Sequence, residues 1–216
     1  RVLKDMMARY PDPLSESIEA RVRLLEILRS RGDQAAVNSA LEDLILADSN
    51  AGEKRSDRSR YLAATALLEL AEPEIRRFSA VRLTQPLTDS VKQKRDLMEN
   101  VIDTYTRAAE YGVAEVTTEA TFRLGETFEG FSADLRNSER PAEMDSAALE
   151  QYELLLEEQV YPFEERAIDL YKANADRAAS GIYDEWVKKS FDRLASLWPG
   201  RYAKSERSED VIRRPF

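Results

Sequence analysis

The sequence predicts an all-α protein built from antiparallel helical hairpins that stack on one another. Hydrophobic residues make up 43% of the 216 residues, whereas only seven glycines and eight prolines interrupt the chain. Apolar residues recur at spacings of three and four, which is the period of a helix with one buried face. No segment shows the period of two that is typical of a half-buried strand. We therefore expect helices throughout the folded part.

Residues 1–50 predict an N-terminal helical hairpin. Its first helix, over 14–31, carries apolar residues at helical spacing, namely Leu14, Ile18, Val22, Leu25 and Leu28. Gly32 is expected to end this helix and Asp33 to cap the next one, which covers about 34–47. Because the break between them is so short, the two helices must run antiparallel.

Residues 51–202 predict a region of further helical repeats. The polar segment 48–60 is expected to be an exposed loop and the best candidate for a boundary or flexible connection. Pro73 either kinks the following helix or begins a new one. Gln85-Pro86 interrupts the helical pattern again, and a long helix is expected to follow it and to end at Gly112.

The rest of the chain continues the same pattern. The expected segments are a helix through 120–135, a polar break over 136–146, helices over about 147–160 and 163–179 that Pro162 separates or bends, and a last helix after Gly181. Pro199-Gly200 is expected to end regular structure, and 203–216 to form a polar C-terminal tail.

The charge of the chain disfavours nucleic acid and anionic lipid as partners. It carries 32 Lys plus Arg against 41 Asp plus Glu, a net charge of −9, which favours a basic partner. Residues 99–171 concentrate the excess, with 18 acidic and five basic side chains. No stretch approaches the roughly 20 apolar residues that cross a bilayer, so this segment is not expected to insert into a membrane. The sequence begins at Arg1 and not at Met, as a processed or partial chain would, and it leaves open whether a signal peptide or anchor was removed.

Catalysis, cofactor binding and metal binding are not expected. The chain has no Cys and no His, which excludes a Cys nucleophile, a zinc finger and a Ser-His-Asp relay. The acidic pairs Glu157-Glu158 and Glu164-Glu165 do not converge, because adjacent helical residues point about 100° apart. The alternative is a hydrolase or lyase that works through carboxylates, which needs two acids with separated pKa values in one pocket.

A repeat motif lies in the second half of the chain. Leu124-Gly125-x-x-Phe128 stands as the L-G-x-x-Y core of a first repeat helix, and Ala148, Tyr152 and Leu155, which are expected to be buried, have the spacing of the small and aromatic positions of a second helix. These residues resemble the tetratricopeptide (TPR) repeat. The resemblance implies a TPR-like α-solenoid with Gly125 at a close contact between helices. An unrelated helical bundle is the alternative architecture.

A second resemblance covers roughly residues 95–204. The residues that carry it are Tyr111-Gly112-Val113-Ala114-Glu115-Val116-Thr117, Ser138-Glu139-Arg140-Pro141, Glu150-Gln151-Tyr152, Tyr161-Pro162-Phe163-Glu164-Glu165 and Gly181-Ile182-Tyr183-Asp184-Glu185-Trp186-Val187. They resemble proteobacterial cell-envelope TPR proteins found with ExbB/ExbD- or TolQ/TolR-type proton-driven motors, including gliding-motility and TonB-linked systems. The resemblance implies a periplasmic or envelope-associated, non-catalytic scaffold. The alternative is a cytoplasmic TPR-like assembly factor or co-chaperone.

Partner binding is expected on one helix face. In a TPR register, Phe122 faces the concave groove together with Glu119, Glu126 and Glu129. We expect these residues to bind a basic or amphipathic segment of another protein, with Phe122 as the apolar anchor and the carboxylates setting the association rate. The alternative is that Phe122 packs against a neighbouring helix and that the glutamates form a solvated face. The sequence leaves the partner's identity and the oligomeric state open.

Overall fold

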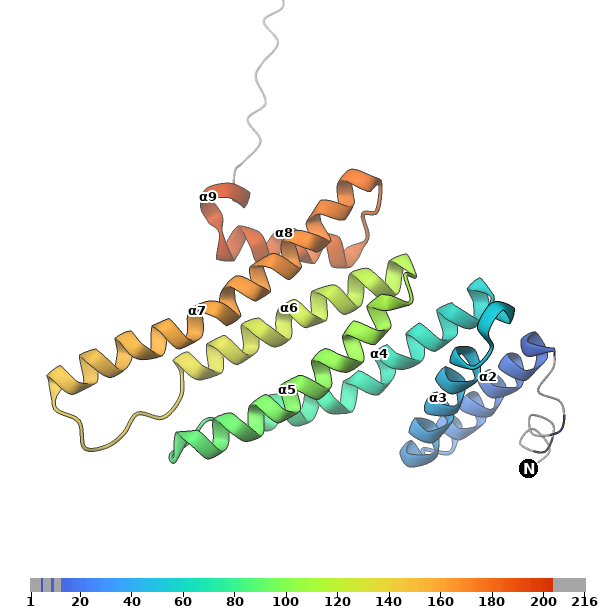
Figure 1. The fold of residues 1–216 in the computed structure, drawn as a ribbon, viewed down its shortest axis with the longest axis horizontal. Helices are drawn as coiled ribbons and strands as arrows, with labels where there is room; N and C mark the ends of the chain where they lie inside the picture. The colour runs from blue at the N-terminus through green and yellow to red at the C-terminus, as the bar shows by residue number, and fades with distance from the viewer. Residues whose placement is uncertain (1–4, 6–8, 10–12, 204–216) are drawn as a thin grey trace, which may run out of the picture.

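A computed structural model describes Asp5, Arg9 and residues 13–203 of the protein. The α-helices are α2 (Leu14–Ser30), α3 (Gln34–Ser49), α4 (Asp57–Ala80), α5 (Leu87–Glu110), α6 (Ala114–Arg136), α7 (Ser146–Asp176), α8 (Glu185–Leu197) and α9 (Pro199–Tyr202), with short 3-10 helices η1 (Gly52–Lys54) and η2 (Arg177–Ser180) (Figure 1). No β-strand occurs in the described residues, so the all-α prediction is confirmed for them. The expected tail over 203–216 lies outside the described residues, apart from Ala203.

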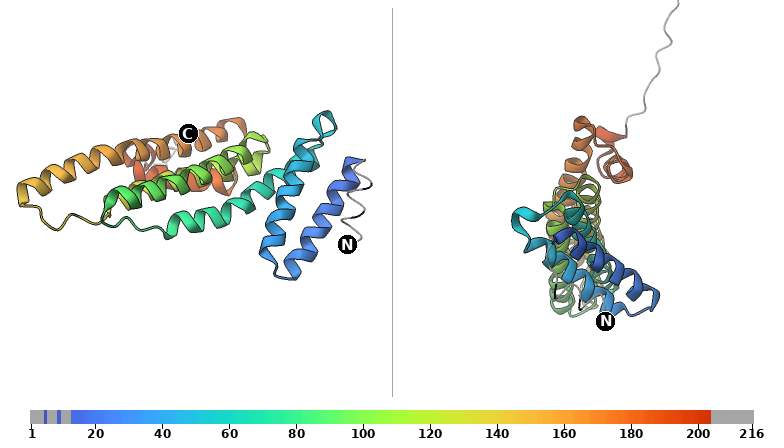
Figure 2. Two further views of the ribbon diagram at one scale, coloured as in Figure 1. Left: turned by 60° about the horizontal axis from the view of Figure 1, so that its bottom comes forward. Right: turned by 90° about the vertical axis from the view of Figure 1, so that its right-hand side faces the viewer.

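The helices form an elongated, layered array. Helices α4 to α7 lie side by side, whereas the α2–α3 hairpin at one end is turned relative to them (Figures 1 and 2). Each helix packs against the next one along the chain, and further contacts join α4 to α6 and α6 to α8. Helix α6 therefore packs against α4, α5, α7 and α8.

Residues that flank the helices determine several of the helix boundaries. Gly32 follows α2 with a φ of 70°, and the Asp33 carboxylate accepts a hydrogen bond from the Ala36 amide at 3.0 Å, as expected. Three further caps that accept amide hydrogen bonds are Ser56 before α4, Asp145 before α7 and Asp184 before α8. Such caps satisfy the amides that have no partner within the first helical turn.

The connection between α3 and α4 is shorter than the exposed loop predicted over 48–60. Helix α3 continues to Ser49 and α4 begins at Asp57, with η1 between them. Asp48 is fully buried and forms an ion pair with Arg55 at 2.7 Å, and the Arg55 guanidinium lies 5.0 Å from the centre of the Tyr111 ring at the end of α5. Burial, together with the Asp48 carboxylate, raises the pKa of Tyr111. The connection is therefore fastened to both α3 and α5.

Two of the prolines lie inside helices, which excludes the alternatives that Pro73 begins a new helix and that Pro162 ends one. Pro73 lies within α4 and Pro162 within α7, so the two helices expected over 147–160 and 163–179 are one. A proline in a helix removes one backbone hydrogen bond. Buried residues lie before and after each proline, namely Ala71 and Phe78 in α4 and Val160 and Ala167 in α7, and they pack the helix on both sides of it. Pro199 begins α9 instead of ending regular structure, since its fixed φ suits a first helical position.

Helices α6 and α7 approach each other closely at Gly125. A Cβ atom added to Gly125 would lie 2.5 Å from Cε1 of Tyr171, a distance that real Cβ atoms do not show. The Tyr171 ring is fully buried, and its hydroxyl donates a hydrogen bond to the Glu129 carboxylate at 2.8 Å. The expected position of Gly125 at a close helix contact is thereby confirmed.

A buried lysine joins α4, α5 and α6. The Lys94 side chain of α5 is fully buried, and its ammonium donates hydrogen bonds to the backbone carbonyls of Phe78 at 2.9 Å and Val81 at 2.8 Å, where α4 ends. The same ammonium forms an ion pair with Asp134 of α6 at 2.6 Å. A buried charge is stabilised only when its hydrogen bonds are satisfied, and Lys94 meets this condition by binding both neighbouring helices.

Substituting Gly125 tests the close contact. Gly125→Ala forces the buried Tyr171 ring away from α6, and we expect a loss of about 1–3 kcal/mol in the free energy of unfolding, with a larger loss for Gly125→Leu. Gly130→Ala is the matched control, because its added Cβ meets only Phe78 Cε1 at 3.9 Å and should gain up to about 1 kcal/mol of helix propensity. Urea denaturation measures both. Equal effects of the two alanines would contradict the α6–α7 geometry.

Removing the buried ammonium tests its role at the end of α4. Lys94→Met leaves the two carbonyls and Asp134 without their donor, and we expect a loss of roughly 3–5 kcal/mol. Asp134→Asn should cost less, because the ammonium keeps both carbonyl acceptors. Thermal and chemical denaturation measure the two variants. Unchanged stability in Lys94→Met would show that this network does not fasten the three helices.

Candidate protein-binding groove

A groove opens between α4 and α6 above α5. Its volume is about 520 Å³, and it is lined by Glu72, Ile75, Phe78, Ser79, Tyr105, Arg123, Glu126, Thr127, Gly130, Ala133 and Asp134. The apolar part consists of Ile75, Phe78 and the largely buried ring of Tyr105, whose pKa is raised by burial. Of the charged residues in the lining, Arg123 alone is basic, so the groove has an acidic surplus.

Arg123 offsets part of this negative charge. Its guanidinium forms an ion pair with Glu126 at 2.9 Å and lies 3.8 Å from Glu119, one turn earlier on the same helix. Burial is the main cause of the raised pKa of the Glu119 carboxyl, and the nearby Glu185 carboxylate adds to it. Glu119 and Glu126 therefore lie on one face of α6, as expected, but they share an arginine that was not part of the predicted site.

Phe122 does not face the groove. Its side chain is only 4% exposed, and its ring centre lies 5.5 Å from the ring centres of both Tyr171 in α7 and Trp186 in α8. The expectation of an exposed apolar anchor at this position is therefore wrong, and the alternative of packing against neighbouring helices holds. The physical reason is that α8 lies on α6 and covers the side chain.

Glu129 ties three helices together. Its carboxylate accepts hydrogen bonds from the Tyr171 hydroxyl at 2.8 Å and from the Arg193 Nε at 3.0 Å, so it connects α6 to α7 and to α8. Only 18% of its side chain is exposed. Whether Glu129 also contacts a partner stays a prediction, but its charge is already neutralised within the fold.

Sequence reasoning missed the residues that other helices contribute. Glu72 and Tyr105 reach the groove from α4 and α5, and no local spacing relates them to α6. Arg123 could have been found, because it follows Glu119 by four residues and precedes Glu126 by three, which are the spacings of ion pairs on a helix.

A larger groove lies between α3, α4 and α5. Its volume is about 840 Å³, and its lining includes the apolar residues Ile45, Leu46, Leu67, Leu70 and Pro73. The charged residues of the lining alternate in sign, with Glu42, Glu74 and Glu110 against Arg55, Arg77 and Arg107. This groove therefore has no net charge that would select a partner.

No group of three or more Asp and Glu side chains that could hold a metal ion occurs among the described residues. None of the helices described combines the length and apolar character needed to span a membrane.

Truncating Phe122 distinguishes a core residue from a surface anchor. Because its ring is buried between α7 and α8, Phe122→Ala should lower the free energy of unfolding by about 3–5 kcal/mol. Glu126→Ala removes only an exposed ion pair and should cost under about 1 kcal/mol. Chemical denaturation compares the two. A Phe122→Ala variant as stable as the parent would contradict the buried position of Phe122 and favour an exposed side chain that contacts a partner.

Comparison with protein-family models, with curated proteins and with solved structures finds no match to this chain. The function is therefore argued from the residues and their geometry.

Proposed function

We propose that the chain is a non-catalytic protein-binding scaffold of the TPR-like α-solenoid type. The order of helix contacts supports this architecture: α4–α5 and α6–α7 are successive hairpins, and the first helix of each, α4 and α6, also contacts the first helix of the following unit, α6 and α8. Helical-repeat proteins stack in this way and use the resulting concave surface for binding.

The groove between α4 and α6 is the observation that carries the proposal. It is formed by first helices of adjacent hairpins, is open to solvent and has apolar side chains between charged ones. Glu72, Glu126 and Asp134 lie in its lining, each paired within the fold with Arg76, Arg123 or Lys94, and they are the groups that a basic or amphipathic protein segment would approach. Exposed ion pairs each contribute little affinity, typically under about 1 kcal/mol. Apolar contact must supply the rest, chiefly with the half-buried Ile75, because Tyr105 is only 2% exposed.

We further propose a location in the bacterial cell envelope, as an accessory of a proton-driven motor or a TonB/Tol-like complex. The support is the resemblance carried by segments such as Ser138-Glu139-Arg140-Pro141 and Tyr161-Pro162-Phe163-Glu164-Glu165. Arg140 forms an ion pair with Glu153, and Phe163 packs on Phe131 with ring centres 4.6 Å apart. These residues therefore hold α6, α7 and their connection together, which is a reason for such segments to be retained in a scaffold.

Site-specific photocrosslinking in the cell that produces the chain tests the proposal. A photoreactive residue in place of Glu126 lies in the groove, and one in place of the exposed Arg31, at the end of α2, is the matched control. We expect the groove position alone to capture a specific protein, identified by mass spectrometry as an envelope motor subunit. Because charge sets the association rate, raising the salt concentration before irradiation should lower the yield.

The outcomes separate the parts of the proposal. Capture of cytosolic proteins only would overturn the envelope assignment and favour a cytoplasmic assembly factor. Equal capture from both positions, or none from Glu126, would overturn the groove as the binding site.

A further inference from the structure

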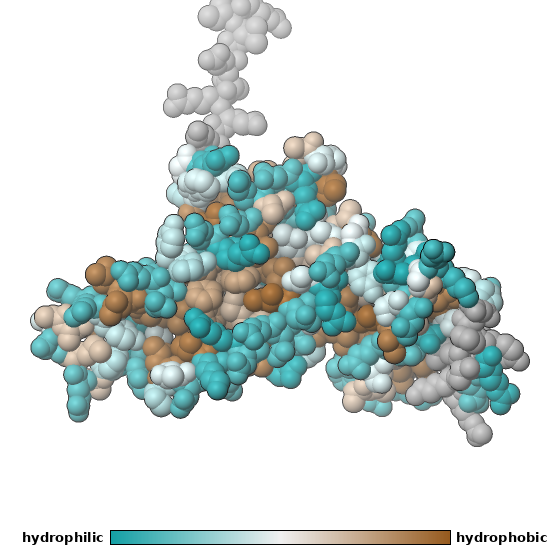
Figure 3. Space-filling model, in the orientation of Figure 1, coloured by the Kyte–Doolittle hydropathy of each residue, from teal (hydrophilic) through white to brown (hydrophobic). Residues whose placement is uncertain are grey.

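Helix α7 carries an exposed apolar stripe on its N-terminal half. Leu154, Leu155 and Tyr161 are 63%, 53% and 62% exposed. Leu154 and Tyr161 are seven residues apart, so they lie two helical turns apart on one face. Figure 3 shows hydrophobic surface along this half of α7, at the left end of the molecule. Single exposed leucines are ordinary, but a row of large apolar side chains on one helix is a mark of a binding surface.

The opposite side of this half of α7 is buried and packs against α6. Leu156 and Val160 are buried, and Phe163 packs against Phe128 and Phe131 of α6. Because this side of α7 faces α6, Leu154 and Tyr161 on the opposite side point outward.

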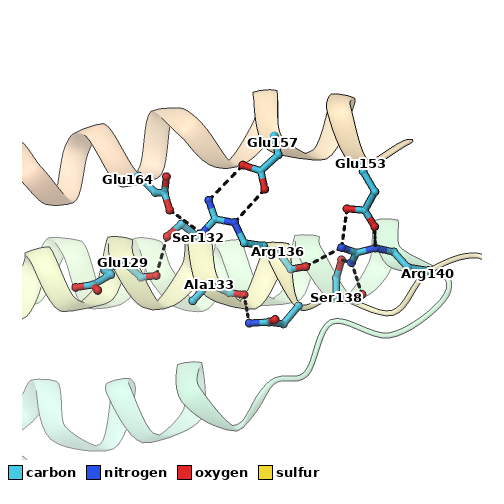
Figure 4. Close-up of polar contacts among 10 residues, drawn as sticks. Glu129, Ser132, Ala133, Arg136, Ser138, Arg140, Glu153, Glu157 and Glu164 are labelled. Carbon is cyan, nitrogen blue, oxygen red and sulfur yellow. Dashed lines mark hydrogen bonds and ion pairs between the residues drawn. The ribbon is translucent and has the colours of Figure 1, made fainter. Parts of the chain in front are cut away.

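Two arginines, one in α6 and one in the connection after it, form ion pairs with the same half of α7. Arg136 forms ion pairs with Glu157 at 3.0 Å and Glu164 at 2.7 Å, and Arg140 binds Glu153 at 2.7 Å (Figure 4). The hydrogen bond from Arg140 lowers the pKa of Glu153, and the one from Arg136 lowers the pKa of Glu157. Together with the buried side chains of α7, these contacts place Glu153, Glu157 and Glu164 on the side of α7 that faces α6 and the connection after it.

The outward face carries acids that the fold does not neutralise. Glu150, Glu158 and Glu165 are exposed, and no cation among the described residues pairs with any of them. At 100° per residue they lie within about 40° of Leu154 around the helix, so they share one face with Leu154 and Tyr161, whereas Leu155 lies about 100° away. Apolar side chains and unpaired carboxylates therefore alternate along the outward face.

The negative charge and the apolar side chains of this face limit which partners can bind to it. A second copy of the same face would bring Glu150, Glu158 and Glu165 against their own equivalents, and like charges across an interface oppose association. Nucleic acid and anionic lipid are repelled for the same reason. An amphipathic helix has apolar residues at the spacing of Leu154 and Tyr161, and lysines or arginines beside them complete the fit.

We propose that the outer face of α7 over residues 150–165, the α7 stripe, binds a basic amphipathic helix of another protein. The α7 stripe is distinct from the groove between α4 and α6, and it rests on the proposed protein-binding function only in that the occupant is a protein segment. Binding there places a partner at the end of the molecule that carries the 137–145 connection.

A defined peptide tests the proposal on the full chain. The probe is a synthetic 18-residue amphipathic helix of leucine and lysine, and its control is a scrambled peptide of the same composition with no apolar face. Isothermal titration calorimetry measures binding. We expect the amphipathic probe to bind at least about tenfold more tightly than the scrambled one, which corresponds to about 1.4 kcal/mol.

Matched variants locate the probe. Leu154→Ser/Tyr161→Ser should weaken binding at least tenfold, whereas Leu46→Ser, at an exposed leucine of α3, should leave it unchanged. Glu150→Gln/Glu158→Gln/Glu165→Gln should also weaken binding, and Glu42→Gln/Glu53→Gln/Glu110→Gln, which removes the same charge from exposed positions elsewhere, should not. Circular dichroism confirms that each variant folds.

Each other result overturns the proposal in a recognisable way. Equal losses in both glutamine triples would mean non-specific attraction by net charge. Loss only in a Glu72→Gln/Glu126→Gln variant would place the probe in the groove, which supports the scaffold function but removes the α7 stripe as a site. Equal binding of the amphipathic and scrambled peptides, or no binding of either, would also overturn the α7 stripe.

Discussion

The contact of the Tyr171 ring with the backbone of Gly125 determines how the C-terminal half of the chain is arranged. Because residue 125 has no side chain, α7 comes close enough for the ring to be buried on α6. The ring then packs against Phe122, whose other neighbour is Trp186 of α8, and its hydroxyl binds Glu129, which also binds an arginine of α8. One missing side chain thus positions both helices that follow α6.

This arrangement decides which surfaces remain available to a partner. Since α8 covers Phe122, the chain itself fills the apolar position that a TPR-like groove would offer at this point. What stays open is a groove with an acidic rim between α4 and α6 and, on the outer side of α7, a row of leucine and tyrosine beside unpaired glutamates. Charge complementarity points to basic segments at both surfaces.

The helices could be predicted from the sequence, but the side-chain contacts that join them could not. Spacings of three and four identified most of the helices, and the L-G-x-x-F fragment identified the close approach at Gly125, because both signals are local. Asp48 and Lys94 were not assigned their buried roles, and the burial of Phe122 was foreseen only as an alternative, since the partners of all three lie on other elements. At Pro73 and Pro162 local propensity left a bend or a break open, and it could not show that α4 and α7 continue through both prolines.

The central claim is that α6 is the helix on which its neighbours are assembled. Hydrogen–deuterium exchange of the full chain tests this directly, because amide protection reports the free energy of local opening. The account predicts the slowest exchange over α6 and over α7 around Tyr171, where side chains are buried on several sides. It predicts faster exchange over the first turns of α7 and the 137–145 connection. Exchange of α6 at the rate of that connection would contradict the account.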